Sequence, residues 1–86
     1  MTEKVLYVRT TPIDQYGDFV QFLILKRKNR YVLEVMDVST DNGLHIWQHI
    51  YTYISAYQKN KIIRALSEGR FEYVFEELNQ KEIYVL

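Results

Sequence analysis

Two histidines, His45 and His49, are the side chains in this sequence whose type and spacing are best suited to chemistry. Residues four apart lie on the same face of either a strand or a helix, so both imidazoles could reach one metal ion or one substrate. A zinc site requires at least three protein ligands, and Asp41 is the only obvious third candidate nearby. Because ligands are so few, the two histidines are better explained as side chains that pack in the fold or lie at its surface. A small enzyme or metal-binding domain that uses His45 and His49 is the least favoured interpretation.

The other side chains capable of catalysis or cofactor binding lack essential partners. Glu72, Glu76 and Glu77 could act as general acid and base, but a solvated acidic face explains them more simply. The segment DVSTDNG, residues 37–43, superficially resembles a calcium loop, but Asn42 stands where such a loop needs its glycine and Gln48 stands where it needs its closing glutamate. The sequence has no cysteine and only three glycines, which leaves no thiolate and no phosphate-binding loop. We therefore expect no catalytic residue, no cofactor and no bound metal.

Aromatic and basic side chains indicate binding instead. Trp47, Tyr51 and Tyr53 alternate within one segment, so in a strand they would form a row of rings on one face together with both histidines. Packing of several of these rings in the core is the alternative interpretation of the row. With Arg27 and Arg30 beside them, however, they are the residue types that dominate protein interfaces. The sequence thus predicts these five residues as contacts for a protein partner.

Single-stranded nucleic acid is the alternative partner. Cations at a hairpin tip and on a helix could contact phosphates while sheet aromatics stack on bases. The same basic tip would also protect a sheet edge from aggregation, and the sequence contains no RNP-type motif. The candidate nucleic-acid contacts are Lys26, Arg27, Lys28, Arg30, Lys59, Lys61 and Arg64.

The elements that must position these residues are mostly strands. Residues 30–38 and 44–54 are rich in Val, Ile, Tyr, Trp and Thr, and the turn residues Asp41, Asn42 and Gly43 separate them, which predicts a β-hairpin. Residues 5–11 and 19–26 predict two earlier strands, the first ended by Pro12 and the second buried on both faces. A tight connection at residues 28–29 leads into the hairpin, so the four strands form an antiparallel meander.

One helix is expected after the meander. Ser55 and Gln58 match a capping box, residues 56–67 are good helix formers, and Gly69 stands where a left-handed residue would end the helix. Residues 71–78 fit both the strand and the helix period. Their aromatic content favours a strand, and residues 82–86 predict a last one.

Length and charge complete the prediction. The 86 residues suffice for one domain, residues 1–86. The net charge is zero, but residues 1–64 carry nine Lys or Arg against six acids, and residues 65–86 carry two against five. The chain has no apolar run long enough for a signal peptide or a membrane span, so we expect a soluble, cytoplasmic protein that does not bind membranes.

These observations predict an α+β fold with a mostly antiparallel, twisted β-sheet. The sheet is a four-stranded meander plus a C-terminal strand or hairpin, with one α-helix packed on one face. The predicted function is a small, non-catalytic protein-binding module, a regulator or inhibitor that acts by occluding its partner. High usage of Ile, Lys, Asn and Tyr indicates an AT-rich genome and, by composition alone, a phage or mobile element as the source.

Overall fold

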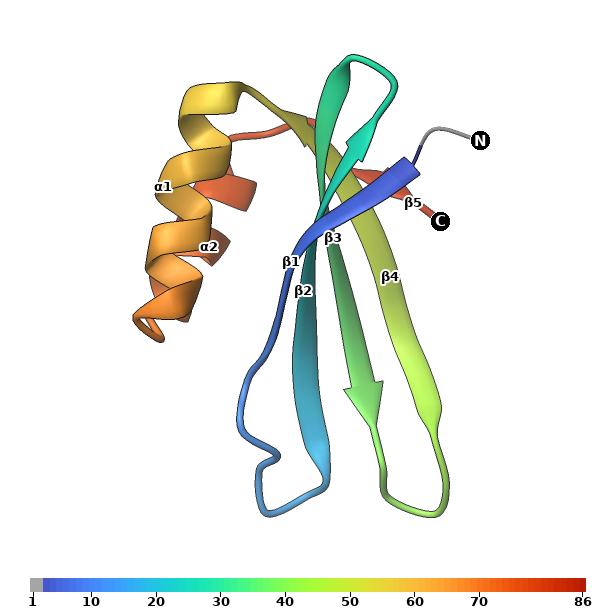
Figure 1. Cartoon of the computed structure of the whole chain (residues 1–86). Helices are drawn as coiled ribbons and strands as arrows, with labels where there is room; N and C mark the ends of the chain where they lie inside the picture. The colour runs from blue at the N-terminus through green and yellow to red at the C-terminus, as the bar shows by residue number, and fades with distance from the viewer. Residues whose placement is uncertain (1–2) are drawn as a thin grey trace.

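A twisted antiparallel sheet forms one layer of the molecule and two helices form the other, in a computed structural model that describes residues 3–86 (Figure 1). This architecture confirms the predicted α+β class and the four-stranded meander. The strands lie in the order β1-β2-β3-β4-β5. No helix among the described residues is long and apolar enough to cross a bilayer. The elements are β1 (Glu3–Thr10), β2 (Asp18–Arg27), β3 (Arg30–Ser39), β4 (His45–Ile54), α1 (Ala56–Ser67), α2 (Phe71–Leu78) and β5 (Tyr84–Val85).

Local sequence signals explain the turns and the first helix. Asn42 and Gly43 both adopt positive φ, +59° and +103°, in the turn between β3 and β4. Ser55 and Gln58 form the complete capping box at the start of α1, each side chain accepting from the other residue's backbone N–H. At its end, the amides of Gly69 and Arg70 donate to the carbonyls of Leu66 and Ala65, the pattern of a Schellman motif.

Residues 71–78 form helix α2, so the expectation of a strand there was wrong. A strand would bury alternate residues, whereas the observed helix buries Val74 and Leu78 on the face toward the sheet. On the same side, the ring of Phe22 in β2 stacks on Phe71 at 5.7 Å and meets Phe75 edge-on at 5.4 Å. The last strand, β5, is also shorter than the predicted 82–86.

The core lies between the helices and one half of the sheet. Its fully buried members include Phe22 and Ile24 of β2, Leu33 of β3, and Ile62 and Leu66 of α1. A ten-residue strand extends for about 33 Å, but the twelve residues of α1 span only about 18 Å. The helices therefore leave the far end of the sheet uncovered, and Figure 1 shows the β1–β2 and β3–β4 connections projecting beyond them.

Candidate protein-binding surface

The projecting part of the sheet, residues 11–20 and 37–48, is named here the hairpin end. Its two loops are joined by Thr40, whose backbone N–H and hydroxyl both donate to the carbonyl oxygen of Gly17, at 2.7 and 2.9 Å. Within the first loop, the Asp14 carboxylate accepts from the amides of Tyr16 and Asp18, at 2.8 and 2.9 Å. These bonds fix the loops against each other, so the hairpin end presents one surface.

Large apolar side chains are exposed on the hairpin end. Five of them have between 56% and 71% of their surface accessible, although each is of a type that proteins usually bury. A concentration of exposed apolar side chains on one part of a protein surface is a reason to consider that part as an interaction site. The five residues are Ile13, Tyr16, Leu44, Ile46 and Trp47.

The charge of the hairpin end is negative throughout. Residues 11–20 and 37–48 contain no Lys or Arg but four aspartates, and strand pairing places the two segments side by side. The β2–β3 turn, at the opposite end of the sheet, instead carries Lys26, Arg27, Lys28 and Arg30. A surface with one sign of charge attracts partners of the other sign, here a cationic one. The four acids are Asp14, Asp18, Asp37 and Asp41.

A β-bulge in β4 divides the row of rings that the sequence predicts on one face. Gln48 pairs with Asp37 and Ile46 pairs with Val38, which leaves Trp47 as an extra residue opposite neither. Directly opposed residues share a face, so Ile46 takes the face on which His45 was expected. The expectation that residues 45, 47, 49, 51 and 53 share one face was therefore wrong.

The predicted partner contacts consequently form two groups. Tyr51 and Tyr53 lie on the sheet face opposite the helices, with ring centroids 5.9 Å apart. Arg27 lies 5.8 Å from the ring of Tyr51, and Arg30 lies 3.5 Å from that of Tyr53. Trp47 belongs instead to the hairpin end, where its nearest aromatic neighbour is the ring of His45 at 6.1 Å.

The two histidines do not converge on a metal or substrate. His45 pairs with Ser39 and His49 with Met36, positions on opposite faces of the sheet. His49 Nε2 donates to the buried carboxylate of Glu34 at 2.9 Å. Over residues 3–86, no three His, Asp or Glu side chains come together as a set of metal ligands.

The predicted nucleic-acid contacts are also separated. Lys26 and Lys59 approach the ring of Tyr31, at 5.9 and 4.6 Å, near the β2–β3 turn. Lys61 and Arg64 instead line a hollow of about 370 Å³ between the helices. The turn therefore gathers only part of the predicted basic set.

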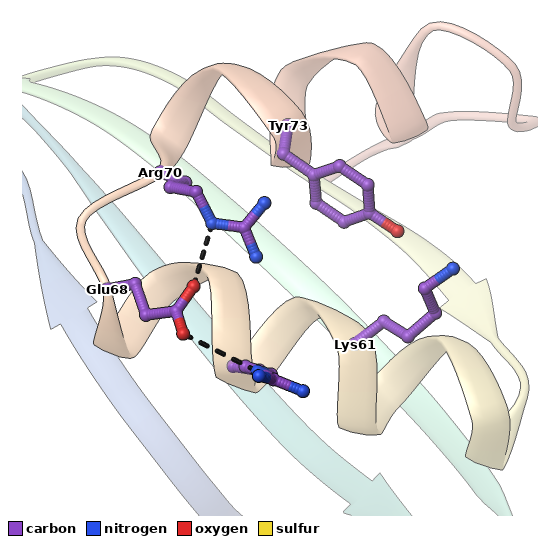
Figure 2. Close-up of a pocket in the computed structure, with 5 residues that line it drawn as sticks. Lys61, Glu68, Arg70 and Tyr73 are labelled. Carbon is purple, nitrogen blue, oxygen red and sulfur yellow. Dashed lines mark hydrogen bonds and ion pairs between the residues drawn. The ribbon is translucent and has the colours of Figure 1, made fainter.

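The hollow between α1 and α2 is charged but internally paired (Figure 2). Glu68 accepts from Arg70 at 2.8 Å and from Arg64 at 3.4 Å. The hydrogen bond from Arg70 is the main cause that lowers the pKa of Glu68 below its ordinary value. Contact with the Tyr57 hydroxyl raises the pKa of Lys61. Glu68 thus engages both arginines of the hollow, which has no exposed apolar side chain comparable to Trp47, so the hollow is a weaker candidate than the hairpin end.

Four residues of the hairpin end, Ile13, Tyr16, Leu44 and Ile46, were missed by sequence reasoning. Two features of the sequence could have identified them. Both loops lack Lys and Arg, and the strands that flank the loops are longer in ångström than the helix that follows. Of the exposed cluster, only Trp47 was predicted. No protein-family model, curated protein or solved structure matches this chain.

Proposed function

We propose that this chain is a non-catalytic protein-binding module, a regulator or inhibitor that acts by occluding its partner through the hairpin end. The observation that carries the proposal is the concentration of exposed apolar side chains on the hairpin end, among them Trp47, which is 70% accessible. Large aromatic side chains lose little entropy on burial and contribute most to interface energies. The hydrogen bonds between Thr40 and Gly17 support it further, because a preformed surface loses less entropy when it binds.

The charge of the hairpin end specifies the kind of partner. The hairpin end has four aspartates and no Lys or Arg, and none of these aspartates forms an ion pair among the described residues. A partner surface with Lys or Arg around an apolar centre is therefore complementary to it. Such complementarity accelerates association and weakens with salt, whereas the apolar contacts set the lifetime of the complex.

Differential affinity capture tests this proposal. The immobilised chain, its Trp47→Ala variant and a Tyr57→Ala control are exposed to bacterial lysate, and the retained proteins are quantified by mass spectrometry. Tyr57 is a matched control because it lies on α1, away from the hairpin end, and is 71% exposed. We expect a basic protein that the original chain and the Tyr57→Ala variant retain and the Trp47→Ala variant loses.

Calorimetry with the retained protein then measures the contribution of Trp47. Trp47→Ala should weaken binding by more than about 1 kcal/mol, which is at least fivefold in Kd, while Tyr57→Ala leaves it unchanged. Retention that is equal for all three forms would contradict the proposal.

Single-stranded nucleic acid is a second candidate ligand, for the opposite end of the sheet. One observation that favours it is the guanidinium of Arg30, which lies 3.5 Å above the ring of Tyr53. The other is that, within residues 3–86, no carboxylate lies within 4.0 Å of the charged groups of Lys26, Lys28 or Arg30. Cations beside an aromatic platform suit phosphates and stacked bases.

Titration with mixed-sequence single-stranded DNA and RNA, at low and near-physiological salt, tests this second candidate. Binding that weakens steeply with salt, and that Lys28→Glu with Arg30→Glu removes, would support it. Equal binding by this charge-reversed variant would contradict it.

A further inference from the structure

The outer edge of β4 is only partly covered. β5 pairs with β4 at Ile50 and Tyr51, and the amide of Leu86 donates to the carbonyl of His49 at 2.9 Å. From residue 45 to residue 48, no other part of the described chain runs beside this edge. The uncovered stretch belongs to the hairpin end and contains Trp47, so free backbone groups and exposed apolar side chains occur together there.

The two edges of the sheet differ in charge, and the bulge at Trp47 is the one edge-protecting feature of the stretch 45–48 in β4. Along β1, Glu3, Lys4 and Arg9 place charges on the free edge, a common device against pairing with other chains. The stretch from Leu44 to Gln48 contains no Asp, Glu, Lys or Arg. An apolar edge strand without charge is a template on which another strand can pair.

We propose that the partner binds by strand addition. An extended segment of the partner would pair with residues 45–48 of β4 and lie in line with β5 along the same edge of the sheet. This proposal rests on the proposed function and specifies its binding mode. Backbone hydrogen bonds to the edge would supply part of the affinity. Alternate side chains of the added strand would contact Ile46 and Trp47, whose exposed surfaces flank the edge.

Charge identifies the added segment as a basic one and argues against a second copy of this chain. Two copies paired through this edge would bring two sets of four aspartates together, with no Lys or Arg in the hairpin end of either. A segment that alternates Lys or Arg with β-branched residues offers strand propensity and the complementary charge at the same time. The occupant is therefore an extended, basic segment of a different protein.

Synthetic peptides test the backbone and charge requirements separately. The probe is a ten-residue peptide of alternating valine and arginine. One control alternates valine and glutamate, and the other is the valine–arginine peptide with its backbone amides N-methylated, which keeps every side chain and removes the donors. Binding is followed by Trp47 fluorescence, and backbone hydrogen exchange locates the site.

The valine–arginine peptide should bind at least tenfold more tightly than either control and slow the exchange of amides within residues 45–49. Equal binding of the N-methylated peptide would overturn strand addition, while side-chain docking at the hairpin end, judged by the capture experiment, would stand. Equal binding of the glutamate peptide, protection along β1, or no binding of the valine–arginine peptide would also overturn it. Sedimentation that shows a dimer of the free chain, with protection at the β4 edge, would replace the partner segment by a second copy.

Discussion

Replacement of Gly17 by alanine should separate the two loops of the hairpin end. Gly17 has a φ of +81°, and a Cβ there would lie 2.9 Å from the Thr40 Oγ1 atom and 3.1 Å from the backbone nitrogen of Asp41. Both distances are shorter than ordinary van der Waals contact. The second involves backbone, so a change of one side-chain rotamer does not relieve it.

The expected cost has two parts. A non-glycine residue in the left-handed region costs about 1–2 kcal/mol. Displacement of Thr40 also weakens its hydroxyl bond to Gly17, worth about 1 kcal/mol. Gly69→Ala isolates the first part, because Gly69 has a similar φ of +75° and a Cβ there meets no atom within 4 Å. Gly17→Ala should therefore lower the free energy of unfolding by about 2–3 kcal/mol, and Gly69→Ala by about 1–2 kcal/mol.

Urea unfolding, followed by far-ultraviolet circular dichroism, measures both losses. Backbone amide shifts in the native state should also change at residues 39–41 in Gly17→Ala but not in Gly69→Ala. Equal losses of stability, with the amide shifts of residues 39–41 unchanged, would refute the inference that Gly17 holds the loops together.

Three further predictions concern stability. Trp47→Ala should change the free energy of unfolding by less than about 0.5 kcal/mol in urea, because the ring is mostly exposed; a loss above about 2 kcal/mol would place Trp47 in the core. Ser55→Ala removes the capping box and should cost about 1 kcal/mol in the same assay, and an unchanged midpoint would contradict that role of the hydroxyl. The hydrogen bond from Arg70 lowers the pKa of Glu68 in the folded protein below its ordinary value of 4.5. The ionised carboxylate therefore stabilises the fold at pH values above 4.5, and this stabilisation is lost as the pH falls from 4.5 through the lowered pKa. Thermal unfolding of Glu68→Gln should accordingly depend less on pH below 4.5, and an identical pH dependence would disprove the contribution.

Elements whose signals are local were predictable from the sequence. The turn at residues 41–43 and the capping box at Ser55 depend on residues within four positions of each other, and the structure confirms both. Gly69 likewise ends α1 where expected. Such features require only that the backbone meet its own hydrogen-bonding and steric needs.

Features that depend on distant segments were not predictable. Residues 71–78 satisfy both periods, and only the sheet surface around Phe22 decides between them, because it accepts the helical face of Phe71 and Phe75. The bulge at Trp47 has no sequence signal of its own, yet one extra residue moves His45 to the other face. The contact between Thr40 and Gly17 likewise joins segments that sequence reasoning treats separately.

The unequal lengths of strands and helices connect the fold to the proposed function. Ten-residue strands beside helices of twelve and eight residues leave one end of the sheet projecting beyond the helices. In a segment free of other roles, solubility alone would favour polar and charged side chains of both signs. The hairpin end instead combines Leu44, Ile46 and Trp47 with charges of one sign. Neither folding nor solubility accounts for that combination, which supports the proposal of a basic partner that covers these apolar side chains.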